Sequence, residues 1–184
     1  MLVTRKSAIT IEPKDLRIGD SIVVFRSKGA SFCATVHEVT DTSVLFLANE
    51  SVVRMSMNKS RTDNTPFGTS DVNMWLHCEF YQSLPEEIKG NLIELSIPTY
   101  GMIFGHDKLY ERFKPDKDEC LSLMAIRKYR ISDYNNAPEW WWLRNASKKK
   151  ETAMRFAVVD CHGRGTYSDV DVECGVRPYF RIEK

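Results

Sequence analysis

The chain has 184 residues, of which 42% are hydrophobic and 28% are charged, and its formal net charge is +1. This length and composition fit one folded domain with a substantial core, and they exclude disorder as the dominant state. The balance of 26 basic and 25 acidic residues disfavours a nucleic-acid coat protein, although it leaves room for a local basic patch.

The first part of the chain, residues 1–57, is predicted to be rich in β-strand. Apolar and β-branched residues fill the segments 22–25, 32–39 and 44–48, and turn-forming residues separate these segments. Apolar runs this short, between turn signals, are typical of strands. We therefore expect an antiparallel meander here.

A helical part follows at residues 70–90. Ser70 or Asp71 can cap a first helix, whose apolar residues at positions 72, 75, 76 and 80 share one face. Ser83 and Glu86 have the spacing of a capping box, and the second helix can end at Gly90. The sequence therefore predicts two short, consecutive helices.

The middle of the chain gives mixed signals. Apolar residues alternate with polar ones at 93–97, which predicts a half-buried strand. We also expect a strand at 121–125 and a loop at 129–138, whereas the stretch 100–118 has no clear pattern.

The last part, residues 119–184, is predicted to return to strands. Apolar segments at 156–159 and 170–172 flank a glycine-containing turn, which suits a β-hairpin. A final strand is expected at 176–182, with Pro178 marking an edge or a bulge.

Three consecutive tryptophans are the most informative feature of the sequence. In a strand, Trp140 and Trp142 share one face, while Trp141 and Leu143 share the other. The rings either pack in the core, with their indole N–H groups bonded to backbone, or offer a stacking platform to a sugar or a partner side chain. Arg144, which follows directly, is expected to act as a structural clamp, because a buried guanidinium must find acceptors.

Motifs for catalysis or metal binding are missing from the sequence. The four histidines and five cysteines do not have the spacing of a zinc site or a redox pair, and mostly buried, reduced thiols are expected. No nucleophile elbow, phosphate loop or dinucleotide fingerprint occurs. We therefore expect no enzymatic activity, no metal and no cofactor.

Targeting signals are missing as well. No run of eighteen apolar residues occurs, and the first ten residues lack the apolar centre of a secretory signal. The expectation is a protein made in the cytoplasm that does not enter a membrane.

Two short motifs carry a family resemblance: Trp-Trp-Leu-Arg at 141–144 and Gly-Val-Arg-Pro at 175–178. With supporting segments at 15–20 and 70–76, the chain resembles an uncharacterised bacterial and phage domain family that carries this signature. That family is similar to the C-type-lectin-like fold, in the branch of the formylglycine-generating enzymes. The resemblance implies one α+β domain over residues 1–184, with small twisted antiparallel sheets and two short helices. Asn145-Ala146 replaces the usual Ser-Pro after the first motif.

The resemblance further implies a binding or structural module that is not an enzyme. Its loops would meet a protein partner or a cell-surface glycan, for example in a phage tail or virion, as part of a larger assembly. Loops on a rigid sheet are where binding residues concentrate, so the segment between the two motifs is the candidate contact surface. The candidate contact residues are Trp140, Trp142, Asn145, Lys148, Lys149, Lys150, His162, Arg164 and Tyr167. Trp141, Arg144 and Arg177 are expected to hold the fold.

Other functions stay open at this stage. An intracellular phage inhibitor of a bacterial defence complex, comparable to an anti-CRISPR protein, is compatible with a compact domain without a signal. An enzyme of the formylglycine-generating kind would need metal ligands that the sequence does not show. Lys148, Lys149 and Lys150 form either a solvated loop or a phosphate-contacting patch, but the balanced net charge disfavours nucleic acid as the partner.

Overall fold

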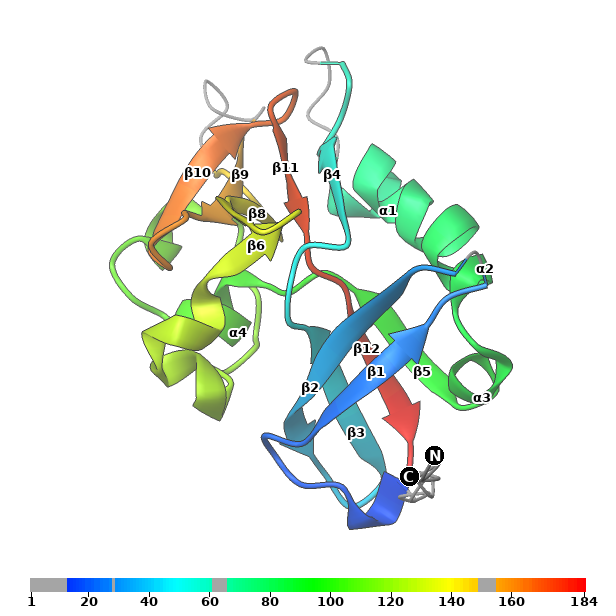
Figure 1. Ribbon diagram of the computed structural model, residues 1–184. Coiled ribbons are helices and arrows are strands. Elements are labelled where there is room, and N and C mark those ends of the chain that lie inside the picture. The colour runs from blue at the N-terminus through cyan, green and yellow to red at the C-terminus, as the bar shows by residue number, and fades with distance from the viewer. Residues whose placement is uncertain (1–12, 28, 61–65, 149–154) are drawn as a thin grey trace.

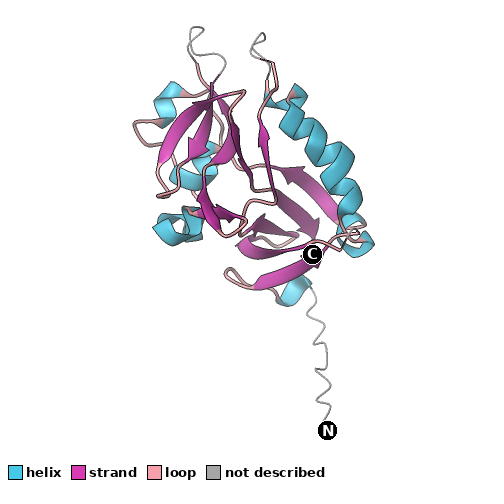
Figure 2. Cartoon of the chain, turned by 45° about the horizontal axis from the view of Figure 1, so that its top comes forward, coloured by secondary structure: helices cyan, strands magenta, loops and turns pink. Residues whose placement is uncertain are grey.

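The computed structural model describes residues 13–27, 29–60, 66–148 and 155–184. Two five-stranded sheets and a two-stranded hairpin form the centre of the chain, and short helices lie around them (Figures 1 and 2). The expected α+β class is confirmed. The sheets are antiparallel except for one parallel pair of strands in the second sheet.

The first sheet has the strand order β1-β2-β3-β12-β5, and all its neighbours are antiparallel. Its central strand β3 is buried on both faces, as its unbroken apolar run requires. The predicted meander is confirmed. The strands are β1 (Ser21–Phe25), β2 (Ser31–Val39), β3 (Ser43–Ala48), β12 (Tyr179–Glu183) and β5 (Leu92–Ser96).

The second sheet has the strand order β10-β9-β8-β11-β4. Its strands are β10 (Gly165–Asp169), β9 (Arg155–Val159), β8 (Trp141–Ala146), β11 (Glu173–Val176) and β4 (Val53–Ser56). The expected hairpin exists, but its second strand is β10 and not 170–172, which forms a turn. Strand β4 was not expected.

The end of the chain links the two sheets. A single strand was predicted at 176–182, but the chain leaves the second sheet after β11 and enters the first sheet at β12 (Figure 1). Arg177 and Pro178 form the crossing. Pro178 has no N–H to donate to a ladder, and its carbonyl accepts the N–H of Ala48 at 2.9 Å. The prediction of one continuous strand was therefore wrong.

The first predicted helix is confirmed as one continuous helical run. It consists of α1 (Asp71–Trp75), the π-helical segment η3 (Leu76–Phe80) and α2 (Tyr81–Ser83). Ser70 caps it, because its Oγ accepts the N–H of Asn73 at 3.1 Å. Val72, Leu76 and Phe80 lie on the buried face, as the spacing predicts.

The predicted capping box of the second helix is not formed. Helix α3 (Glu86–Lys89) has Pro85 at its N-cap and no side-chain cap. Ser83 ends the preceding helix instead: its Oγ donates to the carbonyl of Phe80 at 2.7 Å and accepts from Arg26 Nε at 2.8 Å. A hydroxyl engaged in this way is not available to the N–H of Glu86.

Two expectations for the middle of the chain were wrong. The segment predicted as a strand at 121–125 contains the 3₁₀ turn η5 (Ser122–Ala125), and η6 (Arg127–Arg130) follows. The predicted loop contains the hairpin of β6 (Ser132–Tyr134) and β7 (Ala137–Glu139). The half-buried strand predicted at 93–97 is confirmed as β5, in which Leu95 is buried, although Ile93 is 56% exposed. Further short helical segments are α4 (Tyr100–Phe104), η1 (Pro13–Asp15), η2 (Phe67–Thr69) and η4 (Tyr110–Arg112).

Strand β8 separates two hydrophobic clusters. Trp142 packs in a cluster with the helix that begins at Asp71, whereas Trp141 and Leu143 pack in a second cluster with α4. The alternation predicted for the tryptophans is therefore confirmed, and both faces of the strand are core at these positions. No helix in the described part of the chain has the length and apolar character needed to cross a membrane.

Candidate functional site

The two sequence motifs lie on neighbouring strands of the second sheet. Trp141 in β8 is in parallel register with Gly175 in β11, and the N–H of Gly175 donates to the carbonyl of Trp140 at 2.7 Å. A Cβ at Gly175 would overlap the hydroxyl oxygen of Ser51. Glycine is therefore needed here for close packing.

Arg177 connects the two sheets through its side chain. It is 2% exposed, and its guanidinium carbon lies 4.4 Å from the centroid of the Trp141 ring. Its Nε donates to the carbonyl of Ala48 at 2.9 Å, and its Nη1 donates to that of Tyr129 at 3.1 Å. Burial lowers the pKa of Arg177 to about 9, an effect that the charge of Glu50 opposes. The side chain is thus charged at neutral pH and has the contacts of a clamp.

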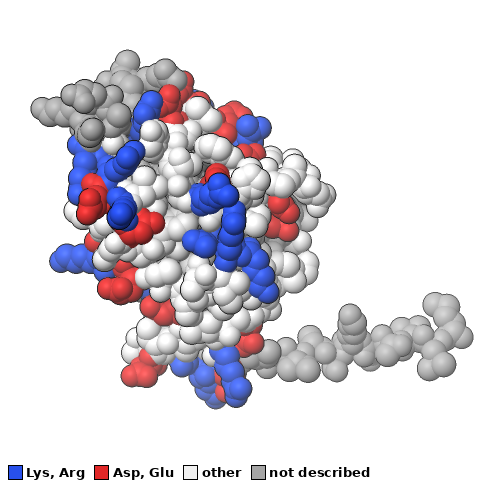
Figure 3. Space-filling model, turned by 90° about the vertical axis from the view of Figure 1, so that its left-hand side faces the viewer, with Lys and Arg blue, Asp and Glu red and all other residues white. Residues whose placement is uncertain are grey.

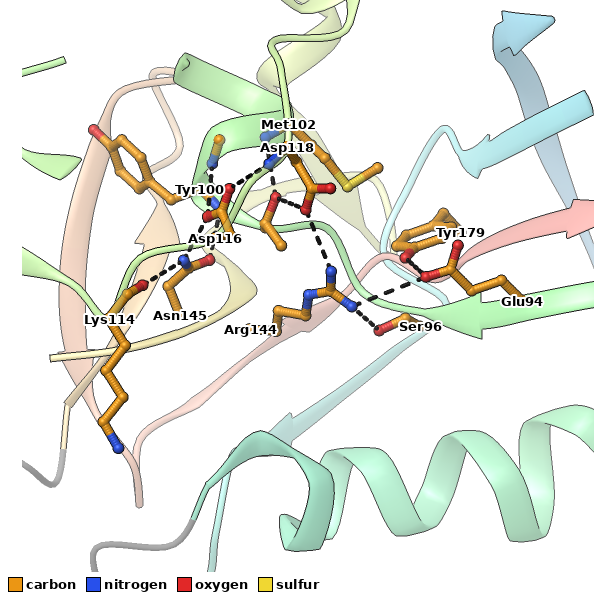
Figure 4. Close-up of polar contacts among 12 residues, drawn as sticks. Glu94, Ser96, Tyr100, Met102, Lys114, Asp116, Asp118, Arg144, Asn145 and Tyr179 are labelled. Carbon is orange, nitrogen blue, oxygen red and sulfur yellow. Dashed lines mark hydrogen bonds and ion pairs between the residues drawn. The ribbon is translucent and has the colours of Figure 1, made fainter. Parts of the chain in front are cut away.

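Arg144 joins the second sheet to the first (Figure 4). Its guanidinium lies 3.3 Å from Asp118 Oδ2 and 4.0 Å from Glu94 Oε1 in β5. Glu94 also accepts a hydrogen bond from the hydroxyl of Tyr179. The pKa of Tyr179 is raised, mainly because the hydroxyl is buried and secondly because of this hydrogen bond. These contacts hold the two sheets together, as expected for a structural role of Arg144.

Asn145 is an anchor for the segment that follows α4. Its Oδ1 accepts the N–H of Tyr100 at 2.7 Å, and its Nδ2 donates to the carbonyl of Lys114 at 3.0 Å and to Asp116 Oδ2 at 2.6 Å (Figure 4). The side chain is buried. Asn145 was expected to contact a ligand, but a buried amide with these three bonds holds backbone segments together instead.

Trp140 and Trp142 differ in what they can contact. Trp142 was a candidate contact residue, but it is fully buried and its indole N–H donates to the carbonyl of Met55 at 2.9 Å. It is therefore a core residue in this structure. Trp140 is 40% exposed, but it does not line the groove described below.

A groove of about 660 Å³ lies beside the hairpin of β9 and β10, and this volume is typical of small-molecule sites. Backbone contacts fix one wall: Phe113 forms an isolated bridge with Ser147, and the N–H of Lys148 donates to the carbonyl of Arg112 at 2.9 Å. The lining residues are Lys108, Glu111, Arg112, Phe113, Ser147, Lys148, Arg155 and Tyr167.

Four of the lining side chains are cationic, and one exposed aromatic ring stands among them. Tyr167 is 38% exposed on the edge strand β10, and the guanidinium carbon of Arg155 lies 5.0 Å from its ring centroid. Arg155 also pairs with Asp169 at 2.7 Å. Lys108, Arg112 and Lys148 are exposed and form no ion pair with another described residue. The groove thus combines positive charge with a surface for ring stacking.

The turn between β9 and β10 lies outside the groove. Asp160 Oδ1 organises this turn by accepting the N–H groups of His162 at 2.8 Å and Arg164 at 2.9 Å. Both of the latter side chains are exposed, and Arg127 Nε donates to the carbonyl of His162. Figure 3 shows Lys and Arg side chains in several clusters on this side of the molecule.

Of the nine predicted contact residues, the structure brings two together in the groove, Lys148 and Tyr167. Lys149 and Lys150 lie outside the described residues. The sequence reasoning missed Lys108, Arg112 and Arg155. The first two come from the stretch without a clear pattern, and no local signal links them to β9.

The described residues contain no cluster of metal ligands, and their cysteines are all free thiols. No group of three or more His, Cys, Asp and Glu side chains is placed there to hold a metal ion. The expectation of mostly buried thiols was wrong: Cys174 is buried, but Cys33, Cys78 and Cys120 are exposed. Burial raises the pKa of Cys174 to about 12, which keeps this thiol protonated.

The fold and the groove define an α+β domain with two linked sheets and a cationic surface site. A family model described as a domain of unknown function (DUF6273) matches residues 42–184. The match covers well over half of the chain, and the chain therefore belongs to this family. Neither the curated proteins nor the solved structures contain a match to the chain.

Proposed function

We propose that this domain is a binding module without enzymatic activity and that its groove beside β10 takes a glycan. The observation that carries this proposal is the joining of Tyr167 and four cationic side chains in one groove with a fixed wall. An exposed aromatic ring stacks on the apolar face of a sugar, while arginine and lysine donate hydrogen bonds to its oxygens. These contacts bind a sugar without any group that reacts with it.

We further propose that the scaffold is of the C-type-lectin-like kind. Two observations support this: the sheets are small and mostly antiparallel, and a long segment without a strand, residues 97–131, separates β5 from β6. The pairing of Trp141 with Gly175 also places the two motifs of the resemblance side by side. A role in phage attachment, which the same resemblance implies, stays a prediction.

The test is binding of the full chain to an array of short neutral and acidic glycans. The proposal predicts retention of at least one glycan, and Tyr167→Ala should weaken it about tenfold, as expected for the loss of a central aromatic contact. Phe25→Ala is the matched control, because Phe25 is an exposed aromatic on the edge strand of the other sheet. It should bind like the wild type. No retention of any glycan, or equal losses in both variants, would refute the proposal.

A further inference from the structure

Strand β10 connects the groove to a second group of cationic side chains. It is the outer strand of its sheet, and its five residues span about 13 Å between the first and the last Cα atom. Arg155 and the groove lie at the Asp169 end. The turn that carries His162 and Arg164 lies at the Gly165 end.

The second group, which we call the turn patch, consists of the cationic side chains of Arg127, Lys128 and Arg164 together with the imidazole of His162. All four residues are exposed. Arg127 donates to the carbonyl of His162, and a Cβ at Gly163 would lie 3.1 Å from the carbonyl oxygen of Arg127. The turn and the 3₁₀ segment η6 are therefore in direct contact, so their cationic side chains share one surface.

We infer that the ligand is a linear acidic polysaccharide that runs along β10, from the groove to the turn patch. This inference rests on the proposed function and adds the class of glycan. Positive charge at both ends of the strand suits a chain whose negative charges recur along its length, and Tyr167 between them suits one stacked ring. The charged group is a carboxylate or a sulfate, since arginine donates to either in a bidentate manner.

Single-stranded nucleic acid fits the same surface less well. Proteins that bind it stack successive bases on several aromatic rings, whereas Tyr167 is the one exposed aromatic residue on β10. Three carboxylates, Glu111, Asp160 and Asp169, also lie along the path. These carboxylates repel the anionic groups of either polymer, but they also accept hydrogen bonds from sugar hydroxyls, which a polysaccharide carries on every ring.

The test is calorimetric titration of the full chain with galacturonate oligomers of increasing length and with sulfated dextran oligomers of matched length. Affinity is expected to rise with oligomer length until one oligomer reaches both groups of cations, and to fall with added salt. The double variant Arg127→Glu and Arg164→Glu should bind the long oligomer about tenfold more weakly. It should bind a single galacturonate like the wild type. The two series show whether carboxylate or sulfate is preferred.

Arg17→Glu is the control for charge reversal, because Arg17 is exposed in the segment before β1, away from β10. Equal losses for Arg17→Glu and the double variant, or an affinity that does not change with oligomer length, would overturn the inference. Tighter binding of a single-stranded oligonucleotide would overturn it in favour of nucleic acid. Binding of short neutral sugars in the groove alone would leave the proposed function intact, whereas no binding of any sugar would remove both.

Discussion

The guanidinium of Arg177 lies over the ring of Trp141, with 4.4 Å between the guanidinium carbon and the ring centroid. The two residues come from the two motifs that the sequence separates by more than thirty positions. Because Arg177 also binds the carbonyl of Ala48 in β3, this contact fixes the place where the chain passes from one sheet to the other.

Removal of this buried cation is expected to destabilise the domain strongly. Arg177→Ala leaves the carbonyls of Ala48 and Tyr129 without their donor and opens a cavity beside Trp141, so the free energy of unfolding should fall by about 3–5 kcal/mol. Arg177→Lys keeps the charge but not the planar stacking and should lose less. Urea unfolding measures both changes. Arg17→Ala, an exposed control, should stay within about 0.5 kcal/mol of the wild type, and a similarly small change for Arg177→Ala would contradict the clamp.

Acid sensitivity is expected to come in part from His37. Burial, and then the charge of Arg177, lowers the pKa of His37 to about 4, while its ordinary value is 6.5. The unfolded chain therefore binds a proton on His37 below about pH 6.5 that the folded chain takes up only near pH 4. Above pH 6.5 His37 is neutral in both states, so its ionisation costs the fold nothing. As the pH falls from 6.5 toward 4, protonation of the unfolded chain lowers the free energy of unfolding by up to about 3 kcal/mol.

His37→Phe isolates this effect. His37 Nδ1 has no hydrogen-bond partner among the described residues, so an apolar ring should be tolerated at pH 7. As the pH falls from 6.5 to 4, the free energy of unfolding should decrease more in the wild type than in the variant. Parallel pH profiles of the two proteins would show that His37 titrates normally.

Gly175 is predicted to be intolerant of a side chain. A Cβ there would overlap Ser51 Oγ, so Gly175→Ala should lower the free energy of unfolding by about 1–3 kcal/mol. Ser51→Gly in the same chain removes the overlapping group and should recover part of the loss. Gly68→Ala, where the added Cβ meets nothing within 4 Å, is the control in the thermal-unfolding series. Equal midpoints for the two alanine variants would show that the strands adjust freely.

The amide of Asn145 is predicted to be essential for the wall of the groove. Asn145→Asp places a second carboxylate next to Asp116 and removes the donor to the carbonyl of Lys114, so we expect a loss of about 2–4 kcal/mol at pH 7. The loss should shrink toward pH 4, where the two carboxyls can share a proton. Asn73→Asp removes an exposed bond to the carbonyl of Gly68 but adds a carboxylate to the first turn of a helix, so it should cost less than about 1 kcal/mol. Hydrogen exchange at Lys114 and Lys148 should speed up in the Asn145 variant alone, and unchanged exchange would contradict this role.

The elements with regular apolar spacing were predictable from the sequence, and the elements held by distant contacts were not. The strand pattern at 44–48 and the helical spacing from Val72 to Phe80 both reflect burial of a periodic face. The 3₁₀ turn η5 has the same apolar content as a strand, and its form depends on packing against α4. The hairpin of β6 and β7 does have a local signal in the sequence, because Asn135 and Asn136 are residues typical of a tight turn and both have positive φ.

The candidate site was predictable only in part, for a similar reason. Lys148 and Tyr167 lie between the two motifs, where the resemblance points. Arg112 enters the groove because Phe113 bridges to Ser147, a contact between segments that no local pattern relates. Trp142 and Asn145 were assigned to the surface because the sequence does not show that both faces of β8 are covered.

The most direct test of the central claim is an amide chemical-shift titration of the isotope-labelled chain with a galacturonate oligomer. The proposed binding module predicts perturbed amides in the segments that carry the groove residues, namely 108–113, 147–148, the start of β9 at Arg155 and β10 around Tyr167, while the amides of β1 and β5 stay unchanged. Shifts confined to the first sheet, or none at saturating oligomer, would contradict a glycan-binding groove beside β10.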